Sequence, residues 1–357
     1  MREADETRRM LSKGINFGHI FFPFEGDRAL DASRWKEMES HLKESEFRRV
    51  AECGFTHVRL NLGRGLLQYP PPAYGLRPEG FEWIDRAVEM AGRQGLGIVL
   101  DMHQTPPPDL FHDSAALAAY ENLWGVIADH FTGRHPTVVF ELINEPRIPE
   151  LMEPYPQADH EARWRTIMRG LARVIHRADP GRFVVVTGGG LGGAEDLARM
   201  GNLDIPRLFY SFHYYAPLCF THQGANWLED SISELRGIPY PLTRKAAEEA
   251  GKSGKLKTFF ERNPNGFDKD FMRRDLRPVF EFAAREGIDL YCGGMGVYKP
   301  FAPSRDRARW VGDLVSLVGE EKVGWALWAY GSGFDLVDEK DQPDEDLLLA
   351  MGIGKSV

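Results

Sequence analysis

The sequence predicts an α/β protein built as a single (β/α)8 TIM barrel, and three observations lead to this prediction. Short apolar runs rich in β-branched residues occur eight times along the 357 residues, and amphipathic stretches separate most of them. Strands that are apolar almost throughout and alternate with helices form parallel sheets covered on both faces. No Gly-x-Gly-x-x-Gly follows the first run at Gly14, which favours a closed barrel over an open dinucleotide-binding sheet.

The eight runs and the stretches between them set the expected elements in order. The predicted strands are residues 14–20, 56–62, 97–103, 137–144, 183–188, 208–214, 288–294 and 323–330. The predicted helices are residues 33–53, 78–95, 114–133, 161–181, 194–201, 275–287 and 304–320. In the second of these helices, apolar side chains recur at helical spacing from Phe81 to Ala91, and a glycine ends several of the segments.

The whole chain, residues 1–357, is predicted to form one domain. Its longest interruption, at about residues 215–275, follows the sixth strand and is expected to be a loop insertion on the C-terminal face of the barrel. The part from Thr243 to Arg274 is locally basic, which we interpret as a solvated helical insertion. No repeat or low-complexity linker marks a domain boundary.

Composition excludes several classes of function. The net charge of -9 argues against a nucleic-acid partner. Cys53, Cys219 and Cys292 lack the spacing of a zinc site or a disulfide framework, and no run of 18 apolar residues predicts a membrane span. The charged N-terminus has no apolar signal core, so we expect a cytoplasmic protein or a secreted one whose signal peptide has been removed.

Polar and aromatic residues gather at the predicted C-terminal ends of the strands, where barrels of this kind carry their active sites. These residues are Asn16, His19, Arg59, Asn61, Asp101, His103, Asn144, Glu145, His213, Tyr215 and Trp328. Each also has a simpler interpretation: Arg59 could form a structural ion pair, and Trp328 could plug the barrel while Trp325 packs outside it. A metal site at Asp101, His103 and His213 is a further alternative, although the sequence lacks an HxH or HxxxH pair.

The segment FELINEP is the most informative of these strand ends. Glu145 follows a buried strand and precedes Pro146, which places a carboxylic acid on a rigid support in a partly desolvated mouth. Desolvation should raise its pKa toward that of a general acid. The alternative is a loop-start tripeptide without a catalytic role.

Seven segments together resemble glycoside hydrolase family five, in the clan of (β/α)8 retaining β-glycosidases. They are GINFGHIFF, GFTHVRLNLG, GLGIVLDMHQ, VVFELINEP, FYSFHYYAP, YCGGMGVY and GWALWAYG, in the order of the family. The resemblance implies that Glu145 is the acid/base and that Asn144 holds the sugar 2-hydroxyl. It also implies substrate contacts for the remaining matched positions, which are Arg59, His103, His213, Tyr215 and Trp328. Gln104 departs from the second histidine that is common in the family.

The segment YCGGMGVY departs from the family at its most important position. Retaining glycosidases use two carboxyl groups, and the family supplies the nucleophile from strand seven in a G-E-x-G pattern, where this chain has Gly294. In one interpretation the nucleophile has been replaced by design, which gives a hydrolytically impaired or glycosynthase-type enzyme. In the other, the protein is a non-catalytic carbohydrate-binding barrel. Glu141 and Asp335 are poorer substitutes for the nucleophile.

The expected function is therefore that of a retaining β-glycosidase, of endoglucanase or β-glucosidase type, that acts on O-glycosyl bonds of β-glucans or β-glucosides. A β-mannanase is an alternative. The expected partner is a β-linked oligosaccharide, polysaccharide or glycoside, and no cofactor or metal is required because carboxylates can carry out both steps. We also expect Asn16 and Trp227 to contact substrate, with Trp227, Phe220 and the rest of the insertion as a wall of the cleft.

Overall fold

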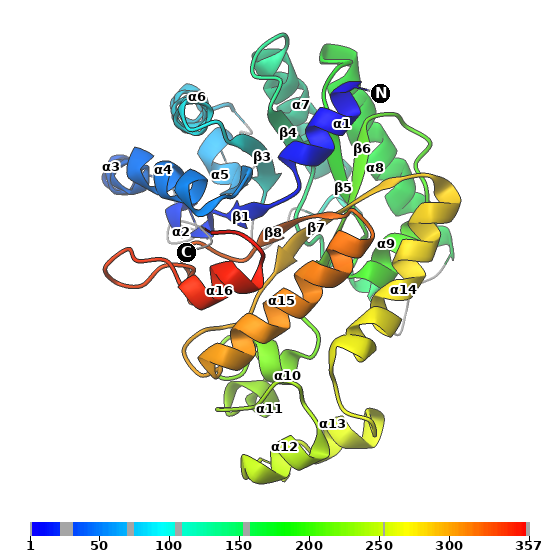
Figure 1. Ribbon diagram of the computed structural model, residues 1–357. Helices are drawn as coiled ribbons and strands as arrows, with labels where there is room; N and C mark the ends of the chain where they lie inside the picture. The colour runs from blue at the N-terminus through cyan, green and yellow to red at the C-terminus, as the bar shows by residue number, and fades with distance from the viewer. Residues whose placement is uncertain are drawn as a thin grey trace.

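The computed structural model describes residues 2–21, 31–69, 75–103, 109–152, 158–252 and 254–354. Eight parallel strands close into one barrel in sequence order, as predicted (Figure 1). The strands are β1 Gly14–Asn16, β2 His57–Leu62, β3 Gly97–Met102, β4 Val138–Glu141, β5 Val184–Thr187, β6 Leu208–Tyr214, β7 Asp289–Met295 and β8 Gly324–Leu327. The first strand is shorter than expected because the chain turns into a helix at Gly18.

Helices surround the barrel. The longer ones are α3 Ala32–His41, α4 Glu44–Cys53, α6 Pro78–Arg93, α7 Ser114–Phe131, α8 Ala158–Ala178, α14 Lys269–Glu286 and α15 Ser304–Glu320. The shorter ones are α2 Gly18–Phe21, α5 Arg64–Leu67, α9 Ala194–Met200 and α16 Glu345–Ala350. The single helix predicted at residues 33–53 is divided into α3 and α4. None of the described helices is long and apolar enough to cross a membrane.

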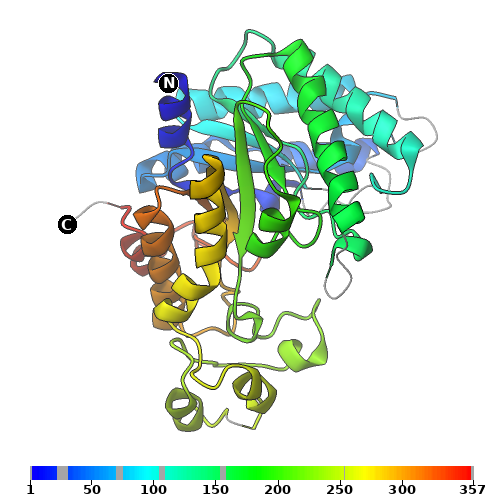
Figure 2. The same cartoon turned by 90° about the vertical axis from the view of Figure 1, so that its right-hand side faces the viewer.

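Helix α1, Arg2–Met10, was not predicted from the sequence. It lies at the end of the barrel opposite the helices of the insertion, as Figures 1 and 2 show. Leu11, which follows it, joins an apolar layer inside the barrel with Val99, Val139, Val185, Phe209, Tyr291 and Ala326. A larger apolar cluster fills the space between the strands and the helices, and Trp325 belongs to it, as predicted. The N-terminal segment thus closes the end of the barrel at which the strands begin.

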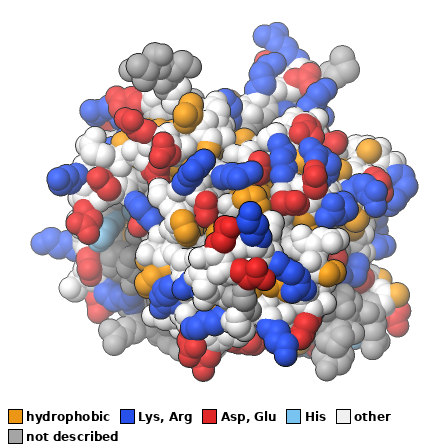
Figure 3. Space-filling model, turned by 60° about the horizontal axis from the view of Figure 1, so that its bottom comes forward, with side chains coloured by type: hydrophobic (Ala, Val, Ile, Leu, Met, Phe, Trp, Pro, Cys, Tyr) orange, Lys and Arg blue, Asp and Glu red, His pale blue; other side chains and the backbone are white. Residues whose placement is uncertain are grey.

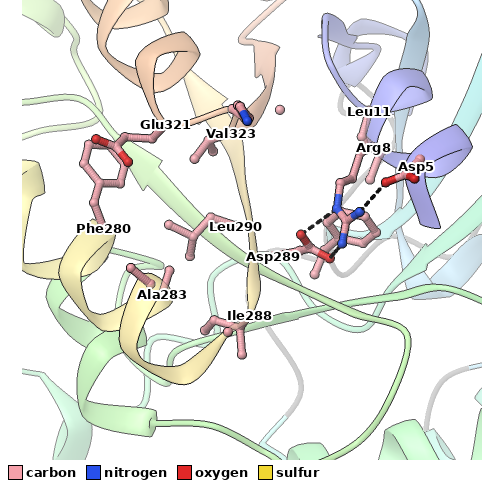
Figure 4. Close-up of a pocket in the computed structure, with 15 residues that line it drawn as sticks. Asp5, Arg8, Leu11, Phe280, Ala283, Ile288, Asp289, Leu290, Glu321 and Val323 are labelled. Carbon is pink, nitrogen blue, oxygen red and sulfur yellow. Dashed lines mark hydrogen bonds and ion pairs between the residues drawn. The ribbon is translucent and has the colours of Figure 1, made fainter. Parts of the chain in front are cut away.

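A cavity of about 500 Å³ opens at this same N-terminal end, between α1, α14 and the starts of β7 and β8 (Figure 4). Arg8 crosses its edge, donating to Asp5 at 2.7 Å and to both Asp289 carboxylate oxygens at 2.7 and 2.9 Å. The charged groups at this edge are therefore already paired with one another. In (β/α)8 barrels this end serves stability, and the chemistry takes place at the other end.

The insertion after β6 contains α10 Leu218–Thr221, α11 Asp230–Ser233, α12 Arg244–Glu249 and α13 Lys257–Arg262. Its apolar side chains join the main core cluster. Tyr240 ties it to α15, since its backbone N–H donates to Asp306 at 3.0 Å and its hydroxyl donates to Asp313 at 2.9 Å. Figure 3, which brings this end forward, shows acidic and basic side chains interspersed over the surface, with no large area of a single charge.

His57 on β2 is buried inside the barrel and is held in its neutral form. Its Nδ1 donates to the Met10 carbonyl at 3.0 Å, and its Nε2 accepts from the Tyr291 hydroxyl at 2.8 Å. Any side chain at Gly14 would overlap the imidazole, so glycine is required there. Burial lowers the pKa of His57 to about 3.

This lowered pKa predicts a loss of stability in acid. Between pH 6.5 and 3 the unfolded chain binds a proton at His57 that the native protein does not bind. The free energy of unfolding should therefore fall with decreasing pH, and His57 should contribute about 1.4 kcal/mol per pH unit to that slope. Urea unfolding of the protein and of His57→Asn, compared between pH 6 and pH 4, measures this contribution. Equal slopes for the two proteins would contradict it.

Candidate active site

The C-terminal mouth of the barrel brings together the residues predicted from the strand ends. Arg59 on β2 has no exposed surface and lies beneath this mouth. Its Nε and Nη2 donate to the two carboxylate oxygens of Glu141 at 2.6 and 2.8 Å, and Nη2 also lies 3.0 Å from Asp101 Oδ2. The same guanidinium donates to Asn144 at 2.9 Å. Arg59 therefore fixes the residue that precedes Glu145.

Glu141 and Asp101 share the guanidinium of Arg59, but their pKa values shift in opposite directions. Burial raises the pKa of Glu141 above its ordinary value, although Arg59 opposes the shift. Burial acts in the same direction on Asp101, but the charges of Arg59 and His103 outweigh it and lower the pKa of Asp101. Both carboxylates lie in the barrel interior with no exposed surface.

Asn16 also lies below the mouth. It is completely buried, and its amide donates to the Gly293 carbonyl at 3.1 Å and to the Leu327 carbonyl at 3.2 Å. Its Oδ1 accepts from Arg59 at 2.8 Å and from Asn61 at 3.0 Å. Asn16 and Arg59 therefore support the side chains at the mouth and present no surface to a ligand, which differs from the predicted substrate contacts.

Glu145 lies at the mouth, with 18% of its side chain exposed. Its Oε1 is 2.9 Å from His213 Nδ1, and its Oε2 accepts from Arg147 Nη2 at 3.1 Å. The predicted rise in pKa is wrong. Burial does act to raise it, but the hydrogen bond and charge of His213 and the nearby Arg147 together lower the pKa of Glu145 to about 2. Glu145 is therefore ionised at neutral pH.

His103, after β3, and Trp328, after β8, form another part of the mouth. Their rings are stacked, with centroids 5.2 Å apart and planes 13° apart. Asp101 binds His103 Nδ1 at 2.6 Å, which fixes the orientation of the imidazole. Trp328 is only half-buried, and the peptide bond that follows it is cis. A partly exposed indole on a fixed support can carry the apolar face of a sugar ring.

This arrangement predicts that Trp328→Ala weakens the binding of the expected β-linked oligosaccharides about tenfold, because stacking on the indole is lost. The fold should persist, since Trp328 is only half-buried. Isothermal titration calorimetry with the variant and the parent protein measures the change. Trp325→Leu is the matched control, because Trp325 is buried outside the barrel and should affect stability rather than affinity. If the affinity of Trp328→Ala is unchanged, Trp328 packs against His103 and does not contact the ligand.

The mouth is completed by Tyr215 and Gly294. A bulge in the pairing of β6 with β7 brings Gly294 opposite His213. A Cβ atom on Gly294 would lie 2.9 Å from the Tyr215 hydroxyl and 3.1 Å from His213 Cγ. Residue 294 therefore faces the mouth, between Tyr215 and His213. Burial, together with the charge of Glu145, raises the pKa of Tyr215 well above its usual range, so its hydroxyl stays protonated.

The insertion contributes to the mouth less than predicted. Trp227 is 55% exposed and contacts Tyr298 edge-on, with ring centroids 5.0 Å apart, so it lies at the outer rim. Phe220 is fully buried against Tyr240 and does not wall a cleft. An apolar side chain such as Phe220 gives no indication in the sequence of whether it faces solvent or the core.

The alternative of a metal site is not supported. His103 Nδ1 is bound to Asp101, whereas His213 Nδ1 is bound to Glu145, so the histidines serve separate partners. Across the described ranges, no group of three or more His, Cys, Asp and Glu side chains is arranged to hold a metal ion. Gln104 lies outside the described residues.

Comparison with known proteins identifies the family of the chain. The model of the cellulase family, glycosyl hydrolase family 5, matches residues 22–333. The chain belongs to this family. It is 29% identical over 318 residues to Endoglucanase C of Acetivibrio thermocellus, covering 86% of this chain and 90% of that protein. It is 26% identical over 312 residues to Cellodextrinase A of Ruminococcus flavefaciens, covering 85% and 80%.

Solved structures show the same fold. Thermotoga maritima Cel5A, in a complex with cellobiose, superimposes on this family 5 chain with a TM-score of 0.77 and 23% identity, covering 97% of this chain and 99% of that one. The cellulose synthase subunit Z of Clostridioides difficile gives a TM-score of 0.76 and 20% identity, covering 95% and 99%. At these identities the likeness concerns the fold.

Several residues near the candidate site were not predicted from the sequence. Arg147 follows Glu145 by two residues, and that closeness was the available signal. An aromatic series runs from Tyr215 to His222, with centroids 5.2 Å apart, and on to Phe334 at 5.4 Å, both edge-on. Tyr298 follows at 5.6 Å from Phe334 in a tilted contact. Burial lowers the pKa of His222 to about 4. These rings come from three different loops, and their proximity has no signature in sequence spacing.

Proposed function

We propose that this protein is a β-glycosidase-type member of glycosyl hydrolase family 5 that binds β-linked glucans or β-glucosides and has Gly294 in place of the nucleophile. It is then impaired in hydrolysis but competent in glycosynthase-type transfer. The family match supports the substrate class, as does the similarity to an endoglucanase and a cellodextrinase.

The observation that carries this proposal is that Gly294 and Glu145 lie against the same side chain, His213. Both border the same imidazole, Glu145 through its hydrogen bond to His213 Nδ1 and residue 294 through the adjoining edge of the ring. A retaining glycosidase needs two carboxyl groups roughly 5 to 5.5 Å apart. Of the described acids below Glu145, Glu141 and Asp101 are buried and paired with Arg59, so neither is available as the second group.

The ionised state of Glu145 suits a transfer reaction. With an α-glycosyl fluoride as donor, the fluoride occupies the side of the sugar that faces residue 294 and needs no acid to leave. Glu145 takes the proton of an acceptor hydroxyl, the acceptor oxygen bonds to the anomeric carbon, and fluoride departs with the electron pair of the C–F bond. The β-linked product then accumulates, because no nucleophile is present to cleave it.

The test is to incubate the protein with α-glucosyl fluoride and an aryl β-glucoside acceptor and to follow fluoride release and coupled products. We expect β-linked products, and Glu145→Gln should lower their rate by about 10²-fold or more because the base is lost. Glu89→Gln, at an exposed position on α6, is the matched control and should behave as the parent. Glucan binding without any coupling would instead identify a carbohydrate-binding barrel, the second interpretation of Gly294.

A further inference from the structure

Arg147 is the most exposed of three side chains that are bonded together at the mouth. Its guanidinium donates to Glu145 Oε2 at 3.1 Å, while His213 Nδ1 lies 2.9 Å from Glu145 Oε1. The exposed fraction of the side chain increases from 5% at His213 to 18% at Glu145 and 51% at Arg147. A molecule that approaches Glu145 from solvent therefore meets Arg147 before it meets His213.

The backbone of Arg147 has a conformation that is uncommon for arginine. Its φ of 54° lies in the left-handed region, which residues other than glycine adopt rarely. Two hydrogen bonds hold this turn of the chain, because Arg147 N–H donates to the Gly190 carbonyl at 2.9 Å and Ile148 N–H donates to the Gly189 carbonyl at 3.0 Å. The position of the Arg147 side chain beside Glu145 is therefore supported by the backbone as well as by the ion pair.

The carbonyls that hold this turn belong to a glycine-rich segment, TGGGLGG, which begins at the last residue of β5. The segment packs closely against its surroundings, since a Cβ atom on Gly190 would lie 2.4 Å from Asp196 Oδ2. Further along it, the Gly192 carbonyl accepts from the backbone N–H of His213 at 2.7 Å. One segment therefore supports the backbone of both side chains that bond to Glu145.

The ion pair uses part of the hydrogen-bonding capacity of Arg147. A guanidinium has five N–H donors in a planar fork and no acceptor. Within the described ranges, its hydrogen bond goes to Glu145 and comes from Nη2. The other donors are on a half-exposed side chain, and they suit a ligand that presents oxygen atoms, such as the hydroxyl and ring oxygens of a sugar.

The acceptor of the proposed transfer reaction must lie beside these donors. Glu145 takes the proton of the acceptor hydroxyl, so the acceptor oxygen comes within hydrogen-bond distance of the carboxylate. The fluoride of the donor faces residue 294, which is buried, so the acceptor approaches Glu145 from the solvent side. Arg147 holds Oε2 on that side, and its other N–H groups are then within reach of the neighbouring oxygens of the acceptor.

We propose that Arg147 binds the acceptor sugar, so that the subsite on the solvent side of Glu145 takes a hydroxylated sugar through the guanidinium. This inference rests on the proposed function, because it places the acceptor against the same carboxylate. A neutral sugar suits the subsite better than an anion does, since the charge of Arg147 is already balanced by Glu145. The subsite needs oxygen acceptors from its ligand and no charge.

The first test measures the KM of the acceptor in coupling with α-glucosyl fluoride. Arg147→Gly removes the guanidinium and suits the left-handed backbone. We expect the KM of an aryl β-glucoside acceptor to increase about tenfold, because hydrogen bonds from a charged donor are lost, and the KM of the fluoride donor to stay nearly the same. An acceptor KM equal to that of the parent would overturn the proposal.

Arg207→Gly is the matched control. Arg207 also has a left-handed backbone, with φ of 59°, and its guanidinium pairs with the exposed carboxylate of Glu3 at 2.7 Å. The control therefore carries the same change of residue at the same kind of backbone position, far from the mouth. We expect it to behave as the parent in coupling. An equal rise in acceptor KM in both variants would assign the effect to the backbone and overturn the proposal.

Chemical rescue separates binding from support of the loop. The side chain of Arg147 is half-exposed, so guanidinium ions can enter the space that it leaves in Arg147→Gly. Millimolar guanidinium chloride should restore part of the acceptor affinity, and sodium chloride at the same concentration should not. Arg147→Lys should also retain part of it, because an ammonium group donates hydrogen bonds. A loss that neither guanidinium nor lysine restores would show that Arg147 only supports the loop.

Calorimetric titration with cellotetraose tests Arg147 without any coupling reaction. A tetrasaccharide can extend past Glu145 on the solvent side, and we expect Arg147→Gly to bind it about tenfold more weakly than the parent and Arg207→Gly do. If the parent binds cellotetraose but couples nothing, the proposed transfer fails, and the change in affinity still decides the role of Arg147. Unchanged affinity in Arg147→Gly, or a parent that does not bind cellotetraose, would overturn this inference.

Discussion

Gly294→Glu is expected to increase the hydrolysis of unactivated β-glucans by about 10³-fold or more over the chain as it stands. Removing a nucleophile from an enzyme that uses covalent catalysis costs on the order of 10⁶ in kcat in the best-studied case, so restoring one should recover a large part of such a loss. Reducing-sugar release from β-glucans, β-mannans and aryl β-glycosides measures the gain. The class of substrate that is cleaved also decides between a glucanase and a mannanase.

A side chain at residue 294 makes a close steric contact with Tyr215. The new Cβ would lie 2.9 Å from the Tyr215 hydroxyl, which is closer than real Cβ contacts allow, so the tyrosine must move. The hydroxyl is the end of a side chain at the half-buried mouth, and a shift of a few tenths of an ångström is enough. If activity is recovered only partly, Tyr215→Phe in the same chain relieves the contact and tests whether the loss is steric.

Gly293→Glu is the matched control for this prediction. A Cβ at residue 293 would lie 2.7 Å from Ser211 Oγ and 3.3 Å from both His213 Nε2 and a Tyr291 ring carbon, inside the barrel rather than at the mouth. It should destabilise the protein and produce no gain in hydrolysis. If Gly294→Glu is folded and binds glucans but cleaves none of them, residue 294 is not the nucleophile position.

Arg59→Met is expected to lower the free energy of unfolding by about 3 to 5 kcal/mol. Arg59 is the cation between Glu141 and Asp101, and all three side chains are fully buried. Removing one partner of a buried ion pair leaves uncompensated charge in a medium of low dielectric constant, which is the costly case. Loss of the bond to Asn144 should also reduce activity in a Gly294→Glu background.

Urea unfolding at neutral pH measures this effect. Arg93→Met is the control, since Arg93 forms its ion pair with Glu44 at an exposed position, and such pairs contribute little. Arg59→Met combined with Glu141→Gln should recover part of the stability, because one of the two buried carboxylates is then neutral. A loss in Arg59→Met no larger than that in Arg93→Met would mean that Glu141 and Asp101 are not charged together in the native protein.

Much of the fold and the position of the site could be predicted from the sequence. All eight apolar runs contain strands, because a parallel strand buried on both faces must be apolar along its length. The alternation of side chains along a strand also determined that Trp325 packs outside the barrel. The ends of those strands gave the residues of the mouth, since the C-terminal ends of parallel strands meet at one face.

Only the tertiary structure decided the ionisation and the contacts of these residues. The sequence predicted that burial raises the pKa of Glu145. In the structure, His213, which is 68 residues away in the chain, and Arg147 lower it instead. The sharing of Arg59 between Glu141 and Asp101 and the burial of Phe220 also depend on side chains from different strands and loops. Periodicity along the chain reports which way a residue faces, because the backbone fixes that direction locally. Charge and hydrogen bonding depend on distances between segments, which are set only when the barrel closes.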